Sequence, residues 1–490
     1  MKSTQNHRRL GARRILLTLA LALPLAFLLQ SCGDSGDDAF VYTVNPYSYP
    51  NSLAKVEVTD LGTLGVPGSI AKAKLRQPSA SVAHVGIINM HPSSGYVDQP
   101  VCSQFAEYGY AVICMDSVFT GREGEYYGYE QHAPAIAAAV KYLREKPGIT
   151  KVLLLGRSMG APLMAFYQNA AENGPDACGK NTKLMIPCNT DLIKGLPAAD
   201  GMILIDSHLG EALSSYSYVD PAVTNNNMTA PRIMEVDMFA PSNGYVYGAK
   251  GTGSAKYTEQ FKAKFLAAQA ARNVELNTKA LAMLADARRT NPKSMGDELP
   301  FYVAGSQAAR LFRPDISLLR CTKKPQMLLS HDGTRPADKP VCSVRVGSGD
   351  SDAGLNPDVK NQMISSYVYN VHTWLGSQAM NTLGNYTQTE SNFAGFDPES
   401  SVTSAENNIK GVTKPFLLIA NSGHYFVVPD EILFDAATMK DKTFAIQEGS
   451  VHGGGACVPC AKALGKPDDY FGDTFRRTLE FAVQWIDKRY

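Results

Sequence analysis

The chain has 490 residues, which is long enough for more than one hydrophobic core, although folds that alternate strands and helices often grow by insertion instead. Apolar residues make up 44% of the chain and charged residues 19%, close to ordinary globular values, so the composition argues against disorder throughout. The formal net charge is +1, and nothing in the charge distribution indicates a nucleic-acid partner.

The first 31 residues have the pattern of an export signal and are expected to take no part in the fold. Five basic residues precede an apolar stretch at residues 15–29 that is too short for a comfortable membrane span. Residues 29–32 read Leu-Gln-Ser-Cys and resemble a bacterial lipobox, whose cysteine is lipidated; ordinary signal cleavage nearby is the alternative. We expect Cys32 to carry a lipid anchor to the membrane. Gly33 after it favours an outer-membrane lipoprotein facing the periplasm or the exterior.

Residues 32–50 are expected to form a tether, because residues 33–38 read GDSGDD and contain no apolar side chain. Removing residues 1–31 takes away five of the 47 basic side chains and none of the 46 acidic ones, which leaves 42 and 46, a net charge of −4. The mature chain is therefore mildly acidic, which again gives no reason to expect a nucleic-acid partner.

From residue 53 onward, strand and helix patterns alternate, which is typical of an α/β fold with a mostly parallel sheet and helices on both faces. The predicted strands are residues 56–59, 72–76, 82–90, 110–115, 152–155, 201–206, 415–421 and 443–447. Helices are predicted at residues 98–108, from near Pro134, after Gly160, from Asp430 or Glu431, and at 475–486 after a cap at Asp473.

About two hundred residues separate the strand at 201–206 from the strand at 415–421, which is too long for a simple crossover. We therefore expect a core formed by residues 51–207 and 414–490, with residues 208–413 as an inserted cap or lid region. Within this region, residues 257–289 repeat apolar positions at close to a helical period. This long helix is interpreted either as a lid or as an element that packs on the core.

The stretch at residues 151–165 reads KVLLLGRSMGAPLMA, an apolar strand followed by Gly-x-Ser-x-Gly and a helix. It resembles the nucleophile elbow of the α/β hydrolases, in which a strand turns sharply into a helix and presents the serine at the bend. A glycine-rich turn whose serine caps the helix is the alternative interpretation. The resemblance implies that Ser158 is a nucleophile.

In the family that the chain resembles, an acid and then a histidine follow the serine along the chain. His452 lies just beyond the final predicted strand, in a glycine-rich loop similar to the family's histidine loop. The acid is less clear, because Tyr425 stands about where relatives often carry aspartate. Asp206, at the end of a core strand, is the preferred candidate, and Glu431 is the alternative.

Serine hydrolysis also needs N–H donors for the oxyanion. The resemblance implies the backbone N–H of Met159 as one donor, and an N–H from the loop after residue 90 as the other. This loop reads His-Pro where relatives commonly read His-Gly. Because Pro92 has no N–H, Ser93 is the better candidate for the second donor.

Apart from Cys32 the chain contains eight cysteines, an even number that suggests disulfides in an exported protein. Cys102 and Cys114 are left without an assigned partner. Proximity in the sequence makes the pairs Cys178 with Cys188, Cys321 with Cys342, and Cys457 with Cys460 plausible. A redox or metal motif at residues 457–460 is the alternative interpretation of the last pair.

The resemblance covers residues from about 80 to the end and implies hydrolysis of a small-molecule carboxylic ester through an acyl-enzyme, with no metal or organic cofactor. Two other classes stay open. One is a peptidase or amidase on the same fold. The other is a non-catalytic surface lipoprotein on a hydrolase scaffold, since a fold alone does not fix function. The sequence identifies neither the substrate nor the oligomeric state.

Overall fold

The computed structural model describes residues 53–64, 71–92, 95–122, 125–223, 232–248, 253–305, 310–347 and 366–490. All of these residues belong to one compact unit. The expected signal, Cys32, the tether at residues 32–50 and Ser93 lie outside the described residues. Within the described ranges, no helix combines the length and the apolar character needed to cross a membrane.

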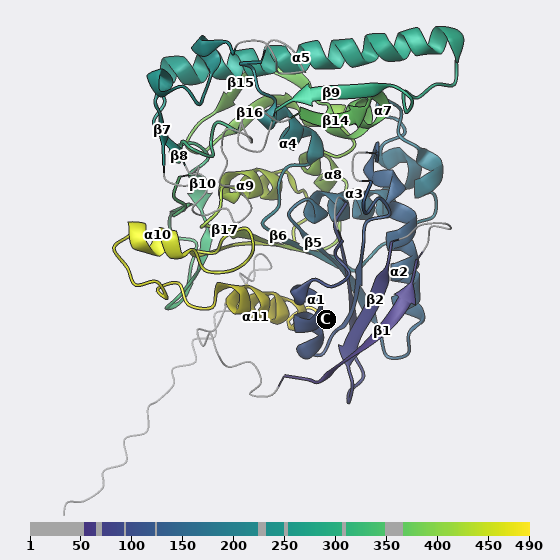
Figure 1. Cartoon of the computed structure of the whole chain (residues 1–490). Helices are drawn as coiled ribbons and strands as arrows, with labels where there is room; N and C mark the ends of the chain where they lie inside the picture. Colours follow the sequence, from purple (N-terminus) through teal and green to yellow (C-terminus); the bar gives the residue numbers. More distant parts are fainter. Residues whose placement is uncertain are drawn as a thin grey trace, which may run out of the picture. The chain divides into compact units, whose positions relative to one another are not determined.

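In the described part of the chain, the main sheet has ten strands in the order β1-β2-β4-β3-β5-β6-β17-β18-β11-β12 (Figure 1). In sequence order they are β1 (Val56–Gly62), β2 (Ala73–Pro78), β3 (Val85–Met90), β4 (Ala111–Met115), β5 (Lys151–Arg157), β6 (Gly201–Ile205), β11 (Met327–Ser330), β12 (Gly333–Arg335), β17 (Phe416–Asn421) and β18 (Lys442–Gln447). The strands from β4 to β11 run parallel, whereas β1, β2 and β12 pair antiparallel with their neighbours. The predicted, mostly parallel sheet is confirmed.

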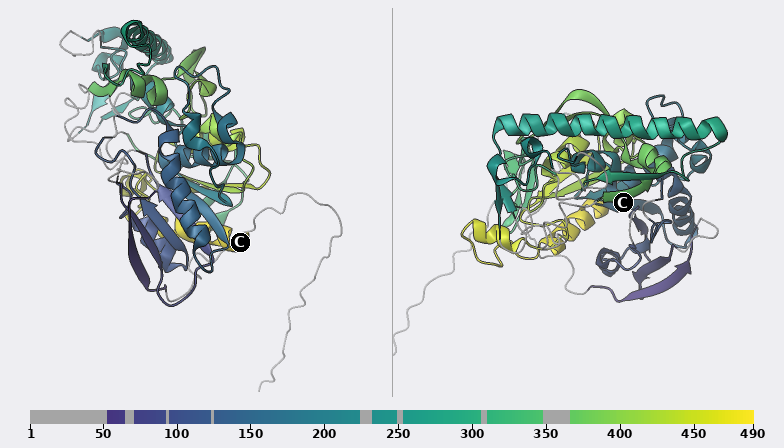
Figure 2. Two further views of the ribbon diagram at one scale, coloured as in Figure 1. Left: turned by 90° about the vertical axis from the view of Figure 1, so that its right-hand side faces the viewer. Right: turned by 45° about the horizontal axis from the view of Figure 1, so that its top comes forward.

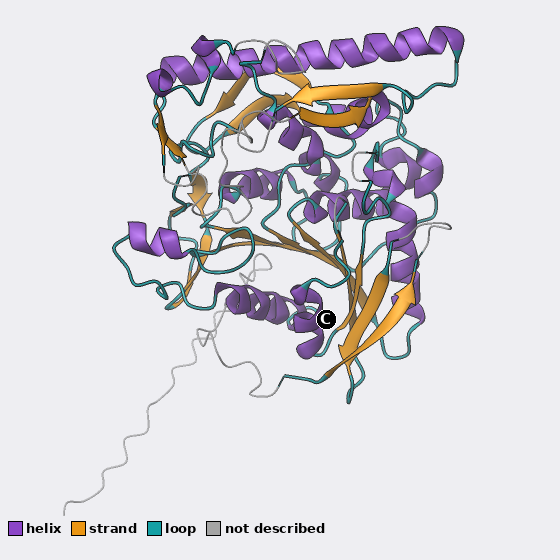
Figure 3. Cartoon of the chain, in the orientation of Figure 1, coloured by secondary structure: helices purple, strands orange, loops and turns teal. Residues whose placement is uncertain are grey.

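The central strands are apolar almost throughout because helices cover them on both sides. On one face lie α1 (Pro100–Glu107) and α11 (Thr474–Asp487), which contact each other. On the other lie α2 (Ala133–Glu145), α3 (Gly160–Asn173), α8 (Ala405–Ile409) and α9 (Val427–Ala436) (Figure 3). The predicted cap of α11 is confirmed, since the Asp473 carboxylate accepts a hydrogen bond from the Arg476 N–H at 2.9 Å.

The start of α9 differs from the prediction. The helix was expected to begin after Pro429, at Asp430 or Glu431, but it begins at Val427. Proline is tolerated in a first helical turn, where its missing N–H would have no partner inside the helix. The prediction therefore placed the start about one turn too late.

Part of the inserted region, residues 208–413, joins the main sheet instead of forming a separate layer. Its strands β11 and β12 extend the main sheet beyond β18, which the sequence did not predict. The other elements are α4 (Glu211–Tyr218), α5 (Glu259–Thr290), α7 (Val371–Thr373) and the antiparallel pairs β7 (Tyr245–Tyr247) with β8 (Gly253–Ala255), β9 (Pro300–Ala304) with β14 (Ser366–Asn370), β10 (Cys321–Pro325) with β13 (Pro340–Cys342), and β15 (Asn381–Gln388) with β16 (Phe393–Asp397). The short helix α10 (Val458–Ala463) follows β18.

The long helix α5 runs along the outer side of the inserted region, away from the main sheet (Figure 2). Phe261 and Phe265, near its start, pack into the main hydrophobic core. Leu276 and Leu284, near its end, pack into a second apolar cluster around Trp374. The helix therefore buries one face along its length, as its sequence period predicts.

Candidate active site

Ser158 lies at the sharp turn between β5 and α3. Its φ of 55° is in the left-handed region, which non-glycine residues rarely adopt and which marks local backbone strain. A Cβ at Gly156 would lie 2.6 Å from Cα of Ala161, and one at Gly160 would lie 2.6 Å from the carbonyl oxygen of Met90. Glycine at both positions therefore lets the helix start closely against the end of β5 and β3.

Asp206 and His452 approach Ser158 from two other parts of the chain. Asp206 directly follows β6 and is fully buried, while His452 lies in the loop after β18. Nε2 of His452 is 2.9 Å from the Ser158 hydroxyl, and Nδ1 of His452 is 2.5 Å from Oδ2 of Asp206. Since the Asp206 carboxylate accepts a hydrogen bond from the Nδ1–H of His452, Nε2 carries no hydrogen and can accept the serine proton.

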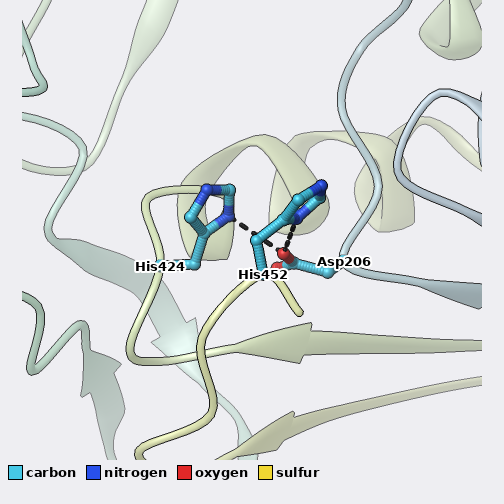
Figure 4. A group of neighbouring side chains, drawn as sticks. All are labelled: Asp206, His424 and His452. Atoms are coloured by element: carbon cyan, nitrogen blue, oxygen red, sulfur yellow. Dashed lines mark hydrogen bonds and ion pairs between the residues drawn. The ribbon is translucent and has the colours of Figure 1, made fainter. Parts of the chain in front are cut away.

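A second histidine reaches the same carboxylate oxygen. Nδ1 of His424, in the loop after β17, lies 2.9 Å from Oδ2 of Asp206, and the rings of His424 and His452 stack 4.5 Å apart (Figure 4). The other oxygen of Asp206 accepts the Asn421 N–H at 3.1 Å. The carboxylate is therefore held in one orientation from three sides.

These partners decide the charge of Asp206. Burial by itself would raise the pKa of the Asp206 carboxyl, but the charges and hydrogen bonds of His424 and His452 outweigh burial and hold the pKa well below its usual value. In the neighbouring Asp430, burial and the charge of Asp206 raise the pKa well above its usual value. Asp206 is therefore the ionised carboxylate beside His452.

The alternative acid, Glu431, lies in a different environment. Its carboxylate accepts the backbone N–H groups of Lys323 and Lys324 at 2.7 and 2.9 Å, and the Gln326 amide at 3.0 Å. These contacts join α9 to the inserted strand β10. The structure thus brings Ser158, His452 and Asp206 together, and it places Glu431 in a contact with the inserted region.

The expected oxyanion donors are described in part. Met159 follows Ser158 and caps α3, so its N–H belongs to the start of that helix. The loop after β3 is fixed through the Pro92 carbonyl, which accepts the Ser117 hydroxyl at 2.5 Å and lies 3.3 Å from Nε2 of His132. Ser93 itself is outside the described residues.

Three observations now agree: the order of the strands in the sheet, the strained serine between a parallel strand and a helix, and the order of serine, aspartate and histidine along the chain. The chain has the α/β-hydrolase fold. Its helices α1 and α11 on one face and α2, α3 and α9 on the other agree with the covering on both faces that this fold requires.

No family model matches the sequence, and no curated protein matches it. Among solved structures, brefeldin A esterase, a bacterial homologue of human hormone-sensitive lipase, is 13% identical with a TM-score of 0.38, covering 90% of this chain and 77% of its own. Est1E from Butyrivibrio proteoclasticus is 10% identical with a TM-score of 0.36, covering 88% and 98%. An acylaminoacyl peptidase from Pyrococcus horikoshii is also 10% identical with a TM-score of 0.36, covering 90% and 43%. All three similarities are weak, so the sheet order and the elbow geometry carry the fold assignment.

In this α/β-hydrolase fold, several contacts around His452 were not predicted from the sequence. The Arg157 side chain, at the variable position before the serine, donates a hydrogen bond to the His452 carbonyl. Phe426 packs edge-on against the His452 ring at 5.5 Å. His91 is buried and stacks on Tyr96 at 4.5 Å, and burial together with the charges of His452 and Arg157 lowers its pKa to about 3. The sequence offered one signal that His91 and His424 belong to the site, namely that each histidine lies just after the end of a predicted strand.

The cysteines form four disulfides in the described residues. Three are the predicted pairs of Cys178 with Cys188, Cys321 with Cys342, and Cys457 with Cys460, and the fourth joins Cys102 on α1 to Cys114 on β4. The Cys457 N–H donates to the Gly449 carbonyl at 2.7 Å and so closes the loop that carries His452, and the Cys457–Cys460 bridge directly follows this closure.

Asp206, His424 and His452 also have potential ligand atoms within 4.8 Å of one another, and they are the group in the described ranges that could hold a metal ion. A metal bound at Nδ1 of His452 would replace the hydrogen bond to Asp206 that orients this ring. The observed geometry therefore fits a hydrogen bond between the Ser158 hydroxyl and Nε2 of His452, with Asp206 orienting the ring, better than a metal centre.

Proposed function

We propose that the protein is a serine hydrolase that cleaves carboxylic esters through an acyl-enzyme. The observation that carries the proposal is the hydrogen-bonded series from the Ser158 hydroxyl through His452 to Asp206, with contacts of 2.9 and 2.5 Å. A nucleophile, a base in hydrogen-bond reach and an acid that orients the base are the three groups that acyl transfer by serine requires.

In the proposed mechanism, Ser158 Oγ attacks the ester carbonyl while Nε2 of His452 accepts the serine proton. Asp206 stays ionised and stabilises the positive charge that His452 then carries. His452 returns the proton to the leaving alcohol as the acyl-enzyme forms, and water repeats the sequence to release the acid. The N–H groups of Met159 and of Ser93 are the proposed donors to the oxyanion.

A fluorophosphonate probe tests the nucleophile, because it reacts with activated serines. The wild type should be labelled and the Ser158→Ala variant should not. Equal labelling of both proteins would remove Ser158 from this role, and no labelling or turnover of either would favour the non-catalytic lipoprotein.

Ester and amide hydrolysis use the same three side chains, so a peptidase or amidase is the second candidate. A chain-length panel of chromogenic esters beside peptide amides separates these candidates by kcat/KM. A higher value for every amide than for its matched ester would overturn the ester proposal and leave Ser158 as nucleophile.

The location is a separate proposal, which the motif at residues 29–32 supports. We propose that Cys32 is lipidated and that the mature protein is attached to the outer membrane. Cys32→Ser should move the protein from the membrane fraction to the soluble fraction. Retention in the membrane fraction would show that a different feature anchors it.

A further inference from the structure

Arg310 is a buried cation close to the candidate active site. The side chain is 4% exposed, and it donates to the Tyr425 hydroxyl at 3.1 Å and to the Ser214 hydroxyl. Within the described part of the chain, its hydrogen-bond partners are these two hydroxyls and no carboxylate, and its buried Nε–H has no hydrogen-bond partner. A buried guanidinium normally has an anionic partner, because removing its charge from water costs several kcal/mol.

His208 presents a second buried donor. Its Nδ1 accepts the Gly210 N–H at 3.0 Å, so in the neutral ring Nε2 carries the hydrogen. Burial and the positive charge of Arg310 hold the pKa of His208 well below its usual value, so the ring is neutral at neutral pH. Among the described residues, Nε2 of His208 has no hydrogen-bond partner.

Both donors connect to the catalytic histidine through aromatic contacts. The rings of His208 and His452 pack on the same Phe426 ring, with centroids 5.7 and 5.5 Å from it. Tyr425, which Arg310 contacts, packs on His424 at 3.9 Å. The unpaired donors therefore lie one or two side chains away from His452.

Glu211 is a buried acidic group on which the charge of Arg310 acts, so it supplies part of a counter-charge. Among the described residues, however, the two side chains form no ion-pair contact. Burial raises the pKa of Glu211 to about 7, so a large share of this side chain is uncharged at neutral pH. The buried Arg345, whose charge also acts on Tyr425, donates to the carbonyls of Leu319, Phe312 and Leu318, and like Arg310 it has an Nε–H without a hydrogen-bond partner among the described residues. Arg345 therefore adds positive charge near Tyr425 without adding an acid.

Buried polar groups in native proteins nearly always have partners, so two unpartnered donors near one another need an explanation such as strain, a catalytic role or a bound ion. We propose that His208 Nε2 and the Arg310 guanidinium bind a carboxylate of the substrate, so that the protein takes esters that carry an acid group. This inference rests on the proposed esterase function and narrows its substrate class. Both donors are buried in this structure, so the neighbouring side chains must move apart before a substrate can bind. The acid group is then recognised away from solvent.

Two matched esters test the inference in the acyl part of the substrate: monoethyl adipate, whose acyl chain ends in a carboxylate, and ethyl hexanoate, which has the same chain length and no charge. Butyl acetate and 4-acetoxybutanoate make the same comparison in the alcohol part. Hydrolysis is followed by chromatography of the released acid or alcohol. In at least one pair the acidic ester should have the higher kcat/KM.

Arg310→Met removes the charge and keeps much of the volume. It should lower the ratio of kcat/KM for the preferred acidic ester to that for its neutral match by about 10- to 100-fold, the effect expected for losing a hydrogen bond to a charged group. Arg76→Met is the matched control. Arg76 is also buried, but it lies on β2 and binds Val97 and Asp98, so its loss should leave the ratio unchanged.

Binding to the Ser158→Ala variant separates failure of this inference from failure of the proposed function. Calorimetry should detect monoethyl adipate or 4-acetoxybutanoate, and adding Arg310→Met should weaken binding of that ester at least 10-fold. If wild type hydrolyses the neutral esters as well as the acidic ones, or if Arg310→Met leaves the ratio unchanged, the acid site is refuted and the esterase stands. If the acidic ester binds through Arg310 and is not hydrolysed, the acid site stands and the esterase function fails.

Discussion

Replacing Asp206 with asparagine changes two atoms at the centre of the candidate active site. Oδ2 of Asp206 faces Nδ1 of both His452 and His424, at 2.5 and 2.9 Å, and the other oxygen accepts the Asn421 N–H at 3.1 Å. An asparagine can keep its oxygen toward only one of these sides. If the oxygen stays on the Asn421 N–H, the new NH2 group faces Nδ1 of His452.

That NH2 group needs an acceptor, so His452 must carry its hydrogen on Nε2 rather than on Nδ1. Nε2 then points a hydrogen at Ser158 and cannot accept the serine proton. In the opposite rotamer the NH2 group meets the Asn421 N–H, and two donors face each other without an acceptor. The same exchange in a well-studied serine protease costs about four powers of ten in kcat, or ~5.5 kcal/mol of transition-state stabilisation.

We therefore expect Asp206→Asn to lower kcat for a chromogenic ester by about 10⁴-fold, while circular dichroism and the elution volume stay those of the wild type. Glu431→Gln is the matched control, because it makes the same chemical change in the other candidate acid. It removes an acceptor from the Lys323, Lys324 and Gln326 donors, so it should lower Tm and change kcat by less than about threefold. Near-normal kcat in folded Asp206→Asn would refute the tautomer argument.

Three further predictions follow from neighbouring groups. His424→Phe keeps a ring beside His452 but removes one of the two histidine donors to Asp206, so the Asp206 carboxylate then interacts with His452 alone. The acid limb of the kcat/KM profile should therefore move to higher pH. An unchanged profile would mean that His424 only packs against its neighbours. Burial raises the pKa of Glu211 to about 7 in the folded chain, above its value of about 4.3 in the unfolded chain. As the pH rises between these two values, Glu211 ionises more readily in the unfolded chain, which favours unfolding. The free energy of unfolding should therefore fall over this range in the wild type and fall less in Glu211→Gln, which urea titrations at several pH values would measure. Mass mapping without reduction should recover the Cys457–Cys460 bridge, and free thiols at both positions would contradict it.

The groups that sequence patterns could predict are those at the ends of core strands. The apolar runs before Ser158, Asp206 and His452 predict parallel strands, and parallel strands present their carboxyl ends at one edge of the sheet. This rule also favours Asp206 over Glu431, which follows its strand by about ten residues and begins a helix pattern.

Other features depend on contacts between distant segments, which periodicity does not encode. His424 becomes part of the site because β17 pairs with β6, the strand that Asp206 follows, and Arg157 does so because the His452 loop reaches the end of β5. By contrast, the Cys102–Cys114 bridge spans 12 residues, fewer than the 21 between Cys321 and Cys342, so the proximity rule that predicted the other three pairs also favours this one. The strands β11 and β12 are four and three residues long, too short for a reliable alternating pattern.

The position of β11 and β12 also determines how the sheet ends. Without them β18, five of whose six residues are buried, would be the outermost strand and would expose unpaired backbone groups beside an apolar surface. In the intact chain the boundary is instead β12, a three-residue strand that ends in the exposed Arg335. A short, charged border of this kind discourages strand addition by another molecule. Excising residues 208–413 to obtain a smaller protein should therefore produce self-association through β18, and any shortened version would need to retain residues 327–335.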